Sequence, residues 1–434
     1  MTTPSKLTIT PPPRDNANPP FSGDSLGGRQ ELARKLTTFI GRLSNGGVVA
    51  INAPWGAGKT WFGERWADLL KTEEHKVAFI NAFQQDHIED PFLLIAAELS
   101  QVIESDKKAN FLKKAGAVAE AVVPAVLKTA MHAGINWALH GIEVNKAVDD
   151  VVKKIEEKSE DFAKHWIERK LENYEKEKNS LAGFREALKD AAESEGRPIV
   201  VFVDELDRCR PDFAVSLIER IKHFFDTQNV VFVLLLNREQ LQRSVQGVYG
   251  NATDGEAYLS KFINFFFTFP QPKVEDFIVD RLRMLESANR PDSEDFLRGL
   301  VFWRDFAELS LRDVERACAL FAYREKATYG YFIAYLAILK LKCPAIFDRL
   351  LNGDLSASVD AQDWISSLLR RGAYSDHPLM PYIDELIQFH MLIAKKNVTP
   401  GNLELRFIVN NRIRTSDYPY HLNANLRFID LPIA

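Results

Sequence analysis

The residues best suited to chemistry form a glycine-rich turn that ends in a lysine and a threonine. The segment APWGAGKT, residues 53–60, lies between an apolar run and a helical pattern that continues to about residue 71. Glycines at 56 and 58 would let backbone N–H groups turn inward around an anion, and the following helix start adds partial positive charge. Lys59 can neutralise phosphate oxygens, and the Thr60 hydroxyl can bind Mg²⁺. The spacing predicts a loop that binds nucleotide phosphates.

We expect the nucleotide contacts to extend along this turn into the helix. The residues assigned to nucleotide binding are Trp55, Gly56, Ala57, Gly58, Lys59, Thr60 and Trp61. Ala53 stands where such loops usually begin with glycine, so we expect a slightly altered start of the loop without loss of binding. A chance turn of this composition is the alternative, and the strand before it and helix after it argue against that.

An acidic pair ends a second apolar run. The segment IVVFVDELDR, residues 199–208, places Asp204 and Glu205 directly after β-branched residues. Buried carboxylates without a partner would cost on the order of several kcal/mol, and a metal ion beside them removes that cost. We expect Asp204 to share Mg²⁺ with Thr60, and Glu205 to polarise the water that attacks the γ-phosphate. A solvated acidic pair is the alternative, which the phosphate loop disfavours.

Asn237 and Arg238 follow the next apolar run, residues 230–236. We expect this run to be an extra strand between the strand before the phosphate loop and the acidic strand. Asn237 could then orient the attacking water, and Arg238 could sense or stabilise phosphate charge. An ordinary turn at the strand end is the alternative.

Arg312 is the last catalytic candidate. It lies on the first turn of a helix that Ser310 is expected to cap, so from a lid it could reach the nucleotide. The alternative is a solvated face on which Arg312 and Arg316 pair with acidic neighbours, namely Glu308 and Glu315.

A parallel sheet is needed to bring these residues together. Strand-like runs alternate with helical patterns before residue 104 and again from 198 to 269, as in sheets covered by helices on both faces. We predict an α/β P-loop NTPase fold of the ASCE or STAND-like type, with a helical insertion between the two phosphate-site segments. The predicted parts are a disordered Pro-rich arm (1–22), the NTPase core (23–106 and 183–272), the insertion (107–182), a helical lid (273–345) and a C-terminal helical and mixed region (346–434).

The predicted insertion contains the most apolar stretch of the chain, residues 115–142. Glu120, Pro124 and Lys128 interrupt it, so it does not qualify as a membrane span. Residues 145–179 lack proline and glycine and carry apolar residues at steps of three and four, which predicts a long amphipathic helix. We therefore expect a cytoplasmic helical insertion that binds a partner protein or touches a membrane surface.

Composition excludes several classes of protein. The chain has 434 residues, 46% hydrophobic and 26% charged, with 55 basic and 60 acidic residues giving a net charge of −5. No basic field indicates nucleic acid as a partner. Three cysteines cannot form a disulfide framework, and the N-terminus lacks a signal-peptide pattern, so we expect a cytoplasmic protein. We interpret Cys209 as a packing residue and the aromatic run 265–269 as a buried strand.

Several segments together resemble the KAP family of P-loop NTPases, over roughly residues 24–330. The matching stretches are DSLGGR (24–29), APWGAGKT (53–60), FINAFQQDHIEDPF (79–92), VVFVDELDRCRPDFAVSLIERIKHFFDTQNVVFVLLLNREQL (200–241), AYLSKFINFFFTFP (257–270) and SLRDVERA (310–317). The resemblance implies an ATP-binding and ATP-hydrolysing switch of bacterial type. Members commonly occur in mobile or defence loci, so it also suggests a role in anti-phage defence.

By position, the resemblance implies specific roles and specific departures. The implied Walker A residues are Gly56, Gly58, Lys59 and Thr60, the implied Walker B residues are Asp204 and Glu205, and Asp207-Arg208 matches the family's D-x-x-D-R extension. Ala53 replaces glycine, Asn237 stands where members usually have Asp, and Phe83 where they usually have Trp. Many members carry transmembrane helices between Walker A and Walker B, where the insertion lies here.

We therefore expect an Mg²⁺-dependent ATPase that switches or assembles, and that transmits its nucleotide state to the insertion and the C-terminal region. An unidentified protein partner and a homo-oligomer are expected through those regions. A nucleotide-gated scaffold with negligible turnover is one alternative. A membrane-associated defence effector that acts through residues 115–142 is another.

Overall fold

The computed structural model describes most of the chain in two compact units. The described residues are 18–88, 90–122, 179–192, 197–224, 227–270, 273–323, 329–371, 377–394, 422 and 425–427. The predicted amphipathic helix at 145–179 falls almost wholly outside them, as do most of the stretch 115–142 and residues 1–17 of the predicted arm. The first unit, called the α/β unit here, comprises residues 29–54 and 59–269; the second, the helical unit, comprises 1–28, 55–58 and 270–434.

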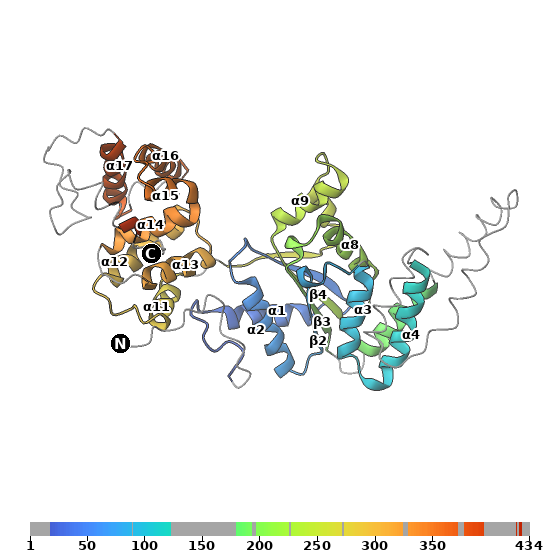
Figure 1. Ribbon diagram of the computed structural model, residues 1–434. Helices are drawn as coiled ribbons and strands as arrows, with labels where there is room; N and C mark the ends of the chain where they lie inside the picture. The colour runs from blue at the N-terminus through green and yellow to red at the C-terminus, as the bar shows by residue number, and fades with distance from the viewer. Residues whose placement is uncertain are drawn as a thin grey trace, which may run out of the picture. The chain divides into compact units, whose positions relative to one another are not determined.

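The α/β unit is built on one parallel sheet of five strands (Figure 1). The strands are β1 (Gly47–Asn52), β2 (Val77–Asn81), β3 (Ile199–Asp204), β4 (Val230–Leu236) and β5 (Phe265–Thr268), in the order β2-β3-β4-β1-β5. The predicted extra strand is therefore confirmed, since β4 lies between β1 and β3. In the register of the sheet Asn81 lies beside Asp204, and Asp204 lies beside Leu235, so the carboxyl ends of these strands meet at one edge.

Helices cover both faces of this sheet. Helices α1 and α2 lie on one side, and α3, α8 and α9 lie on the other (Figure 1). The bounds are α1 (Arg29–Ile40), α2 (Lys59–Thr72), α3 (Pro91–Val102), α4 (Ser105–Val122), α8 (Pro211–Ile221), α9 (Arg238–Tyr249) and α10 (Gly255–Leu259), with short 3₁₀ turns η1 (Phe83–Gln85), η3 (Leu206–Arg208) and η4 (Lys222–Phe224). Because they are covered on both faces, β1, β3 and β4 are buried along almost their whole length, which explains their continuous apolar runs.

The described residues at the start of the predicted insertion and just after its end belong to the core of the α/β unit. Phe111 of α4 and Phe184, in a helix over 179–192, are both buried, and their ring centroids lie 5.2 Å apart. Phe184 also contacts Phe92 of α3 and Phe224 of η4. These aromatic contacts join the start of the predicted insertion, at Phe111, and the segment just after its end, at Phe184, to the sheet-covering helices.

The prediction of a buried strand at residues 265–269 is wrong in one respect. The run does form β5, but β5 pairs only with β1 among the described strands, so it is an edge strand, and the Phe265 side chain is 42% exposed. Its side chains alternate between the two faces. The rings of Phe265 and Phe267 pack against Phe39 of α1, and Phe266 faces the opposite way, under the Arg238 guanidinium.

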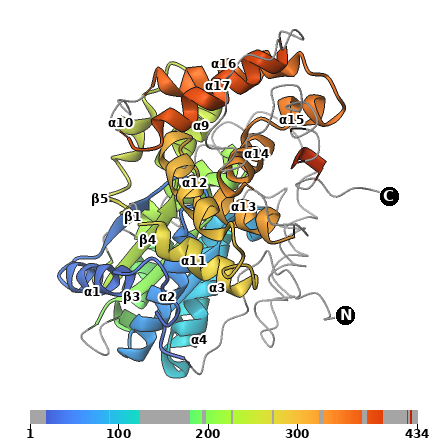
Figure 2. The same ribbon diagram turned by 90° about the vertical axis from the view of Figure 1, so that its left-hand side faces the viewer.

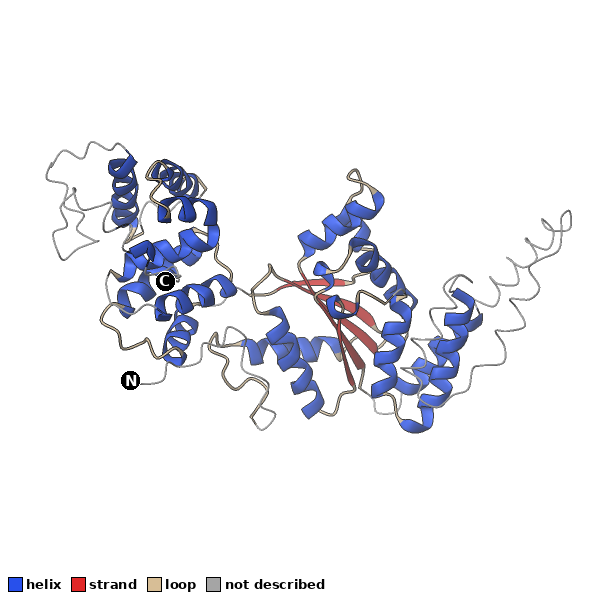
Figure 3. Cartoon of the chain, in the orientation of Figure 1, coloured by secondary structure: helices blue, strands red, loops and turns tan. Residues whose placement is uncertain are grey.

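The helical unit contains only helices among its described regular elements (Figure 3). They are α11 (Glu275–Met284), α12 (Ser293–Phe306), α13 (Leu311–Tyr323), α14 (Gly330–Lys342), α15 (Pro344–Leu351), α16 (Ala357–Leu369) and α17 (Met380–Ala394). Helix α14 is buried on nearly all sides and contacts α12, α13 and α15, while α16 and α17 lie side by side (Figure 2). A helix that is apolar all round is suited to this central position.

Within the described residues, no single helix is both long and apolar enough to span a membrane. Helices α14 and α15 meet the length and composition criteria only as a pair bent by 117°, and the α14 residues Phe332 to Leu339 are buried in the core of the helical unit.

Candidate functional site

The glycine-rich turn connects β1 to α2, as its sequence predicts. Gly56 and Gly58 have φ angles of +77° and +85°, in the left-handed region that residues with a Cβ rarely adopt. The two glycines are therefore required by the backbone path of the loop. Trp55, between the strand and these glycines, is 44% exposed, and α2 begins at Lys59. The loop thus ends on the N-terminus of a helix, where backbone N–H groups are available to an anion.

Lys59 is buried and is held by the loop itself. Its Nζ donates to the carbonyl oxygens of Ala53, at 2.7 Å, and Pro54, at 3.1 Å. Burial lowers the pKa of Lys59, and the nearby carboxylates of Asp207 and Asp204 oppose that decrease. An ammonium has three donors, so the two loop carbonyls leave one donor for a phosphate oxygen.

Asp204 lies at the end of β3, almost fully buried. Its Oδ1 accepts a hydrogen bond from Glu205 N–H at 2.8 Å, and within the described part of the chain its Oδ2 has no hydrogen-bond partner. Burial raises the pKa of Asp204 to about 6, while interactions with the Thr60 hydroxyl and the Glu205 N–H lower it. An unpaired carboxylate oxygen buried next to a hydroxyl is an arrangement that suits a cation with oxygen ligands. Thr60 and Asp204 therefore fit the Mg²⁺ that a phosphate loop requires.

Glu205 follows Asp204 in a left-handed conformation, with φ of 58°. Its Oε1 pairs with Arg208 at 2.7 Å, and its Oε2 accepts from the Asn81 amide at 3.4 Å. Sequence reasoning gave Arg208 no role beyond its place in the D-x-x-D-R extension and did not single out Asn81. The spacing of three residues between Glu205 and Arg208 could have indicated the pair, whereas Asn81 comes next to Asp204 only through the pairing of β2 with β3.

Asn237 and Arg238 both have structural partners in the α/β unit. Asn237 caps α9, since its Oδ1 accepts from the N–H groups of Glu239 and Gln240. The Arg238 guanidinium pairs with Glu256 and lies over the Phe266 ring, with 4.3 Å to the ring centroid. Of the Arg238 partners, Glu256 belongs to α10 and Phe266 to β5. The phosphate roles of Asn237 and Arg238 remain predictions.

Arg312 lies on the first turn of α13 in the helical unit. The predicted serine cap is present, because Ser310 Oγ accepts from Asp313 N–H at 3.2 Å and the Asp313 carboxylate accepts from Ser310 N–H at 3.1 Å. Glu315 pairs with Arg281, at 3.1 Å. The contact between Arg312 and nucleotide remains a prediction.

Trp61, on the first turn of α2, belongs to a stack with arginines. The Arg29 guanidinium lies over the Trp61 ring, with 5.0 Å to the centroid, and also over Phe269 at 5.4 Å. Arg65 approaches the same indole at 5.5 Å. A nucleotide contact by Trp61 remains a prediction, and these cation–π interactions give its ring a structural role next to the loop.

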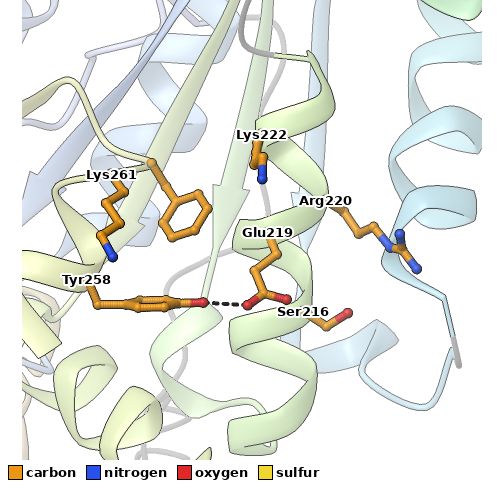
Figure 4. A pocket seen from close by; sticks show the side chains of 7 residues that line it. Ser216, Glu219, Arg220, Lys222, Tyr258 and Lys261 are labelled. Carbon is orange, nitrogen blue, oxygen red and sulfur yellow. Dashed lines mark hydrogen bonds between the residues drawn. The ribbon is translucent and has the colours of Figure 1, made fainter. Parts of the chain in front are cut away.

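A cavity of about 460 Å³ lies elsewhere in the α/β unit (Figure 4). It is lined by Ser216, Glu219, Arg220, Lys222, Tyr258, Lys261 and Phe262. These residues precede β4 and β5 in the chain, so they lie near the amino ends of the strands, whereas the phosphate loop and Asp204 follow the carboxyl ends of β1 and β3. Glu219 in the cavity accepts hydrogen bonds from the hydroxyls of Tyr249 and Tyr258. None of the predicted site residues lines it.

Cys209 is buried near the acidic strand and fits a packing role. Burial raises the pKa of its thiol to about 12, and the nearby carboxylates of Asp86 and Asp207 add to this, so a reactive thiolate is disfavoured.

In the part of the chain that the structure describes, no group of three His, Cys, Asp or Glu residues could hold a metal ion by itself.

Comparisons with known proteins give a match to one family model and similarities to solved structures. Residues 29–327 match the model of the "KAP family P-loop domain". No curated protein sequence matches the chain. Among solved structures, the chain is similar to the Aeropyrum pernix ORC2 protein in its ADPNP–ADP complexes, with 13% identity over 80% of this chain and 76% of that chain and a TM-score of 0.33. The ADP form of the same protein has 14% identity over 98% of this chain and 95% of that chain, with a TM-score of 0.33. A DNA replication initiation factor has 10% identity over 91% of this chain and 92% of that chain, with a TM-score of 0.35.

Proposed function

The chain belongs to the KAP family of P-loop domains, and from that premise we propose that it binds ATP with Mg²⁺ and hydrolyses it. One observation carries the proposal most directly. The buried Asp204 carboxylate, at the end of β3, interacts with the Thr60 hydroxyl and, within the described residues, has one oxygen without a hydrogen-bond partner. Burial of such a group is costly unless a positive charge neutralises it.

The binding step rests on residues of the loop and of α2. The N–H groups around Gly56 and Gly58 would surround the phosphates, and Lys59 would contribute its remaining donor to a terminal phosphate oxygen. Thr60 and Asp204 would hold the Mg²⁺, which supplies positive charge at the phosphate oxygens when it is bound. Trp55 and Trp61 are proposed to complete the nucleotide site beside the loop.

The chemical step needs a carboxylate that lies close to the γ-phosphate and is not itself a metal ligand. Glu205 is the proposed base: it accepts a proton from water as the water oxygen attacks the γ-phosphorus. The bond from that phosphorus to the β–γ bridging oxygen breaks, and ADP and inorganic phosphate are the products. Asn237, Arg238 and Arg312 are proposed to act on the water or on the phosphate charge, secondary to these residues.

The proposed output is a change in the helical insertion and in the helical unit. Phe111 near the start of the insertion packs on Phe184 just after its end, and Phe184 contacts helices that cover the sheet, so a shift of those helices would be transmitted to the insertion. A protein partner or a second copy of the chain would be recognised by a local surface, since the net charge of −5 offers no strong long-range field. Action in anti-phage defence is the setting that the family resemblance suggests.

The experiment that tests the proposal separates binding from turnover. We expect Glu205→Gln to bind MgATP and to release no phosphate above background, and Lys59→Ala to lose binding. Glu239→Gln, an exposed acid on α9, is the matched control and should hydrolyse ATP like the wild type. Turnover by Glu205→Gln at the wild-type rate would show that Glu205 is not the base.

A nucleotide-gated scaffold is the second candidate, because Glu205 is paired with Arg208 and contacted by Asn81. A base held in this way could leave turnover negligible. The scaffold predicts that ATP copurifies with the protein and that phosphate release stays at background in the wild type. Phosphate release that depends on Glu205 would exclude it.

A further inference from the structure

Both carboxylate oxygens of Glu205 are engaged by side chains. Oε1 forms an ion pair with Arg208 at 2.7 Å, and Oε2 contacts the Asn81 amide at 3.4 Å. The charged pair is the stronger of the two, because it is shorter and joins opposite charges. The ion pair stabilises the negative charge of the carboxylate and so makes it a weaker proton acceptor, and the proposed base is stronger once it parts from Arg208.

The local backbone allows the pair to separate without a change in fold. Glu205 precedes the single 3₁₀ turn η3, and Arg208 is its last residue, three positions along. The side chain of Arg208 is 30% exposed and that of Glu205 is 17% exposed. Rotation of the long arginine side chain is therefore sufficient, and water can enter between the two groups.

Arg208 also contributes to the electrostatics of the phosphate loop. The charge of its guanidinium is one of the influences that lower the pKa of Lys59, after burial of the lysine itself. An anion bound by Lys59 would therefore attract the Arg208 guanidinium. Guanidinium groups bind carboxylates and phosphates with the same planar donor geometry, so Glu205 and a phosphate compete for one donor group.

We propose that Arg208 is a positioning residue that holds Glu205 until the third phosphate of the bound nucleotide takes over its guanidinium. The exchange frees the Glu205 carboxylate only when the nucleotide carries a γ-phosphate, so ATP releases the base and ADP does not. This inference rests on the proposed binding of ATP at the loop. It adds a contact that distinguishes ATP from ADP and that neither the loop nor Asp204 provides.

A double-mutant cycle on nucleotide affinity tests the exchange without relying on turnover. Dissociation constants are measured for ADP and for a non-hydrolysable ATP analogue, both with MgCl₂, on the wild type, Glu205→Gln, Arg208→Gln and the double variant. Glu205→Gln removes the competitor, so we expect it to tighten binding of the ATP analogue, on the order of fivefold, and to leave ADP affinity unchanged. In the Arg208→Gln background the same substitution should have no such effect.

The proposal is tested by whether the effect of Glu205→Gln on analogue affinity requires Arg208. If Glu205→Gln tightens analogue binding equally with and without Arg208, simple repulsion between the carboxylate and the phosphates accounts for the gain, and the proposal is wrong. Equal effects on ADP and the analogue would also overturn it. Arg210→Gln, an arginine at an exposed position two residues further on, is the matched control and should leave both affinities at wild-type values.

The cycle is separable from the test of hydrolysis. Loss of turnover in Glu205→Gln together with zero coupling would support the ATPase and reject the role of Arg208. Tight, Arg208-dependent analogue binding together with unchanged turnover in Glu205→Gln would support the exchange and reject Glu205 as the base. Arg208→Lys keeps the charge but loses the planar donor pair, so it should restore only part of the coupling, and it replaces Arg208→Gln if that variant fails to fold.

Discussion

Lys59 Nζ donates a hydrogen bond to the carbonyl oxygen of Ala53 at 2.7 Å, which joins the two ends of the glycine-rich loop. The carbonyl of Pro54 accepts from the same ammonium at 3.1 Å. These oxygens would repel a phosphate, and the lysine neutralises their partial charge. Alanine can stand at position 53, where such loops usually begin with glycine, because the backbone there does not adopt a positive φ angle.

Removal of this lysine should weaken nucleotide binding strongly. Lys59→Ala deletes a charge-assisted contact to phosphate and leaves two loop carbonyls without a donor, so we expect ATP affinity to fall on the order of 100-fold. Isothermal titration with MgATP measures the change. Lys71→Ala, on the last turn of the same helix, should bind ATP as the wild type does. Wild-type affinity in Lys59→Ala would show that the phosphates bind elsewhere.

The left-handed glycine at 58 provides a second test of the loop. Gly58→Ala places a Cβ on a residue with φ of +85°, at a cost of about 1–2 kcal/mol, so the loop should rearrange and ATP affinity should fall roughly tenfold. The matched control is Gly116→Ala on α4, where a Cβ meets nothing within 4 Å. That substitution should raise stability by up to about 1 kcal/mol and leave binding unchanged. Equal affinities in the two variants would contradict the predicted role of the loop.

Substitutions at Asn237 separate helix capping from phosphate sensing. Asn237→Ala removes the side chain that caps α9 and should lower the free energy of unfolding by about 1 kcal/mol, measured by urea denaturation. Asn237→Asp retains the cap and should be at least as stable as the wild type. If Asn237 only caps the helix, the two variants should hydrolyse ATP at similar rates. A large loss of turnover in Asn237→Ala at a temperature where it stays folded would instead support sensing.

A buried histidine should make the helical unit sensitive to acid. His390 on α17 is fully buried next to Tyr335 of α14, with 2.6 Å between Nε2 and the tyrosine oxygen, and burial lowers its pKa to about 3. Its pKa in the unfolded chain is about 6.5, so the unfolded state binds more protons between these values. The free energy of unfolding is therefore highest, as far as His390 is concerned, above about pH 6.5. It falls as the pH drops toward 3, by up to ~1.4 kcal/mol per pH unit.

The variant His390→Gln tests whether His390 causes this loss of stability at low pH. Glutamine does not titrate, so the dependence on pH between about 6 and 4 should flatten relative to the wild type, although packing losses lower its stability at pH 7. Hydrogen exchange of α14 and α17 peptides across that range reports on the helical unit. His377→Gln, in an exposed position beside the Phe302 ring, is the control. Parallel pH curves for the wild type and His390→Gln would contradict the prediction.

The sequence was most informative at positions where few residue types meet the structural or chemical requirement. The strand before the loop, the left-handed glycines and the acidic strand end were all predictable, because backbone sterics and buried charge restrict those positions. The extra strand β4 was predictable because Glu205 next to Asp204 indicated an inserted strand, and the apolar run at 230–236 was a strand candidate of suitable length. The buried strand predicted at 265–269 was wrong because an apolar run does not reveal whether its strand lies at the centre or the edge of a sheet.

The sequence by itself determined which residues could bind a nucleotide, because Gly56, Gly58, Lys59 and Asp204 owe their roles to steric freedom or to charge. Only the tertiary structure decided which partners those residues have. Asn81 contacts Glu205 because β2 pairs with β3 across more than a hundred residues of chain, and Arg238 faces Glu256 and Phe266 because of how α9, α10 and β5 pack. Such contacts depend on strand order and helix packing, to which residue type and spacing along the chain give no direct access.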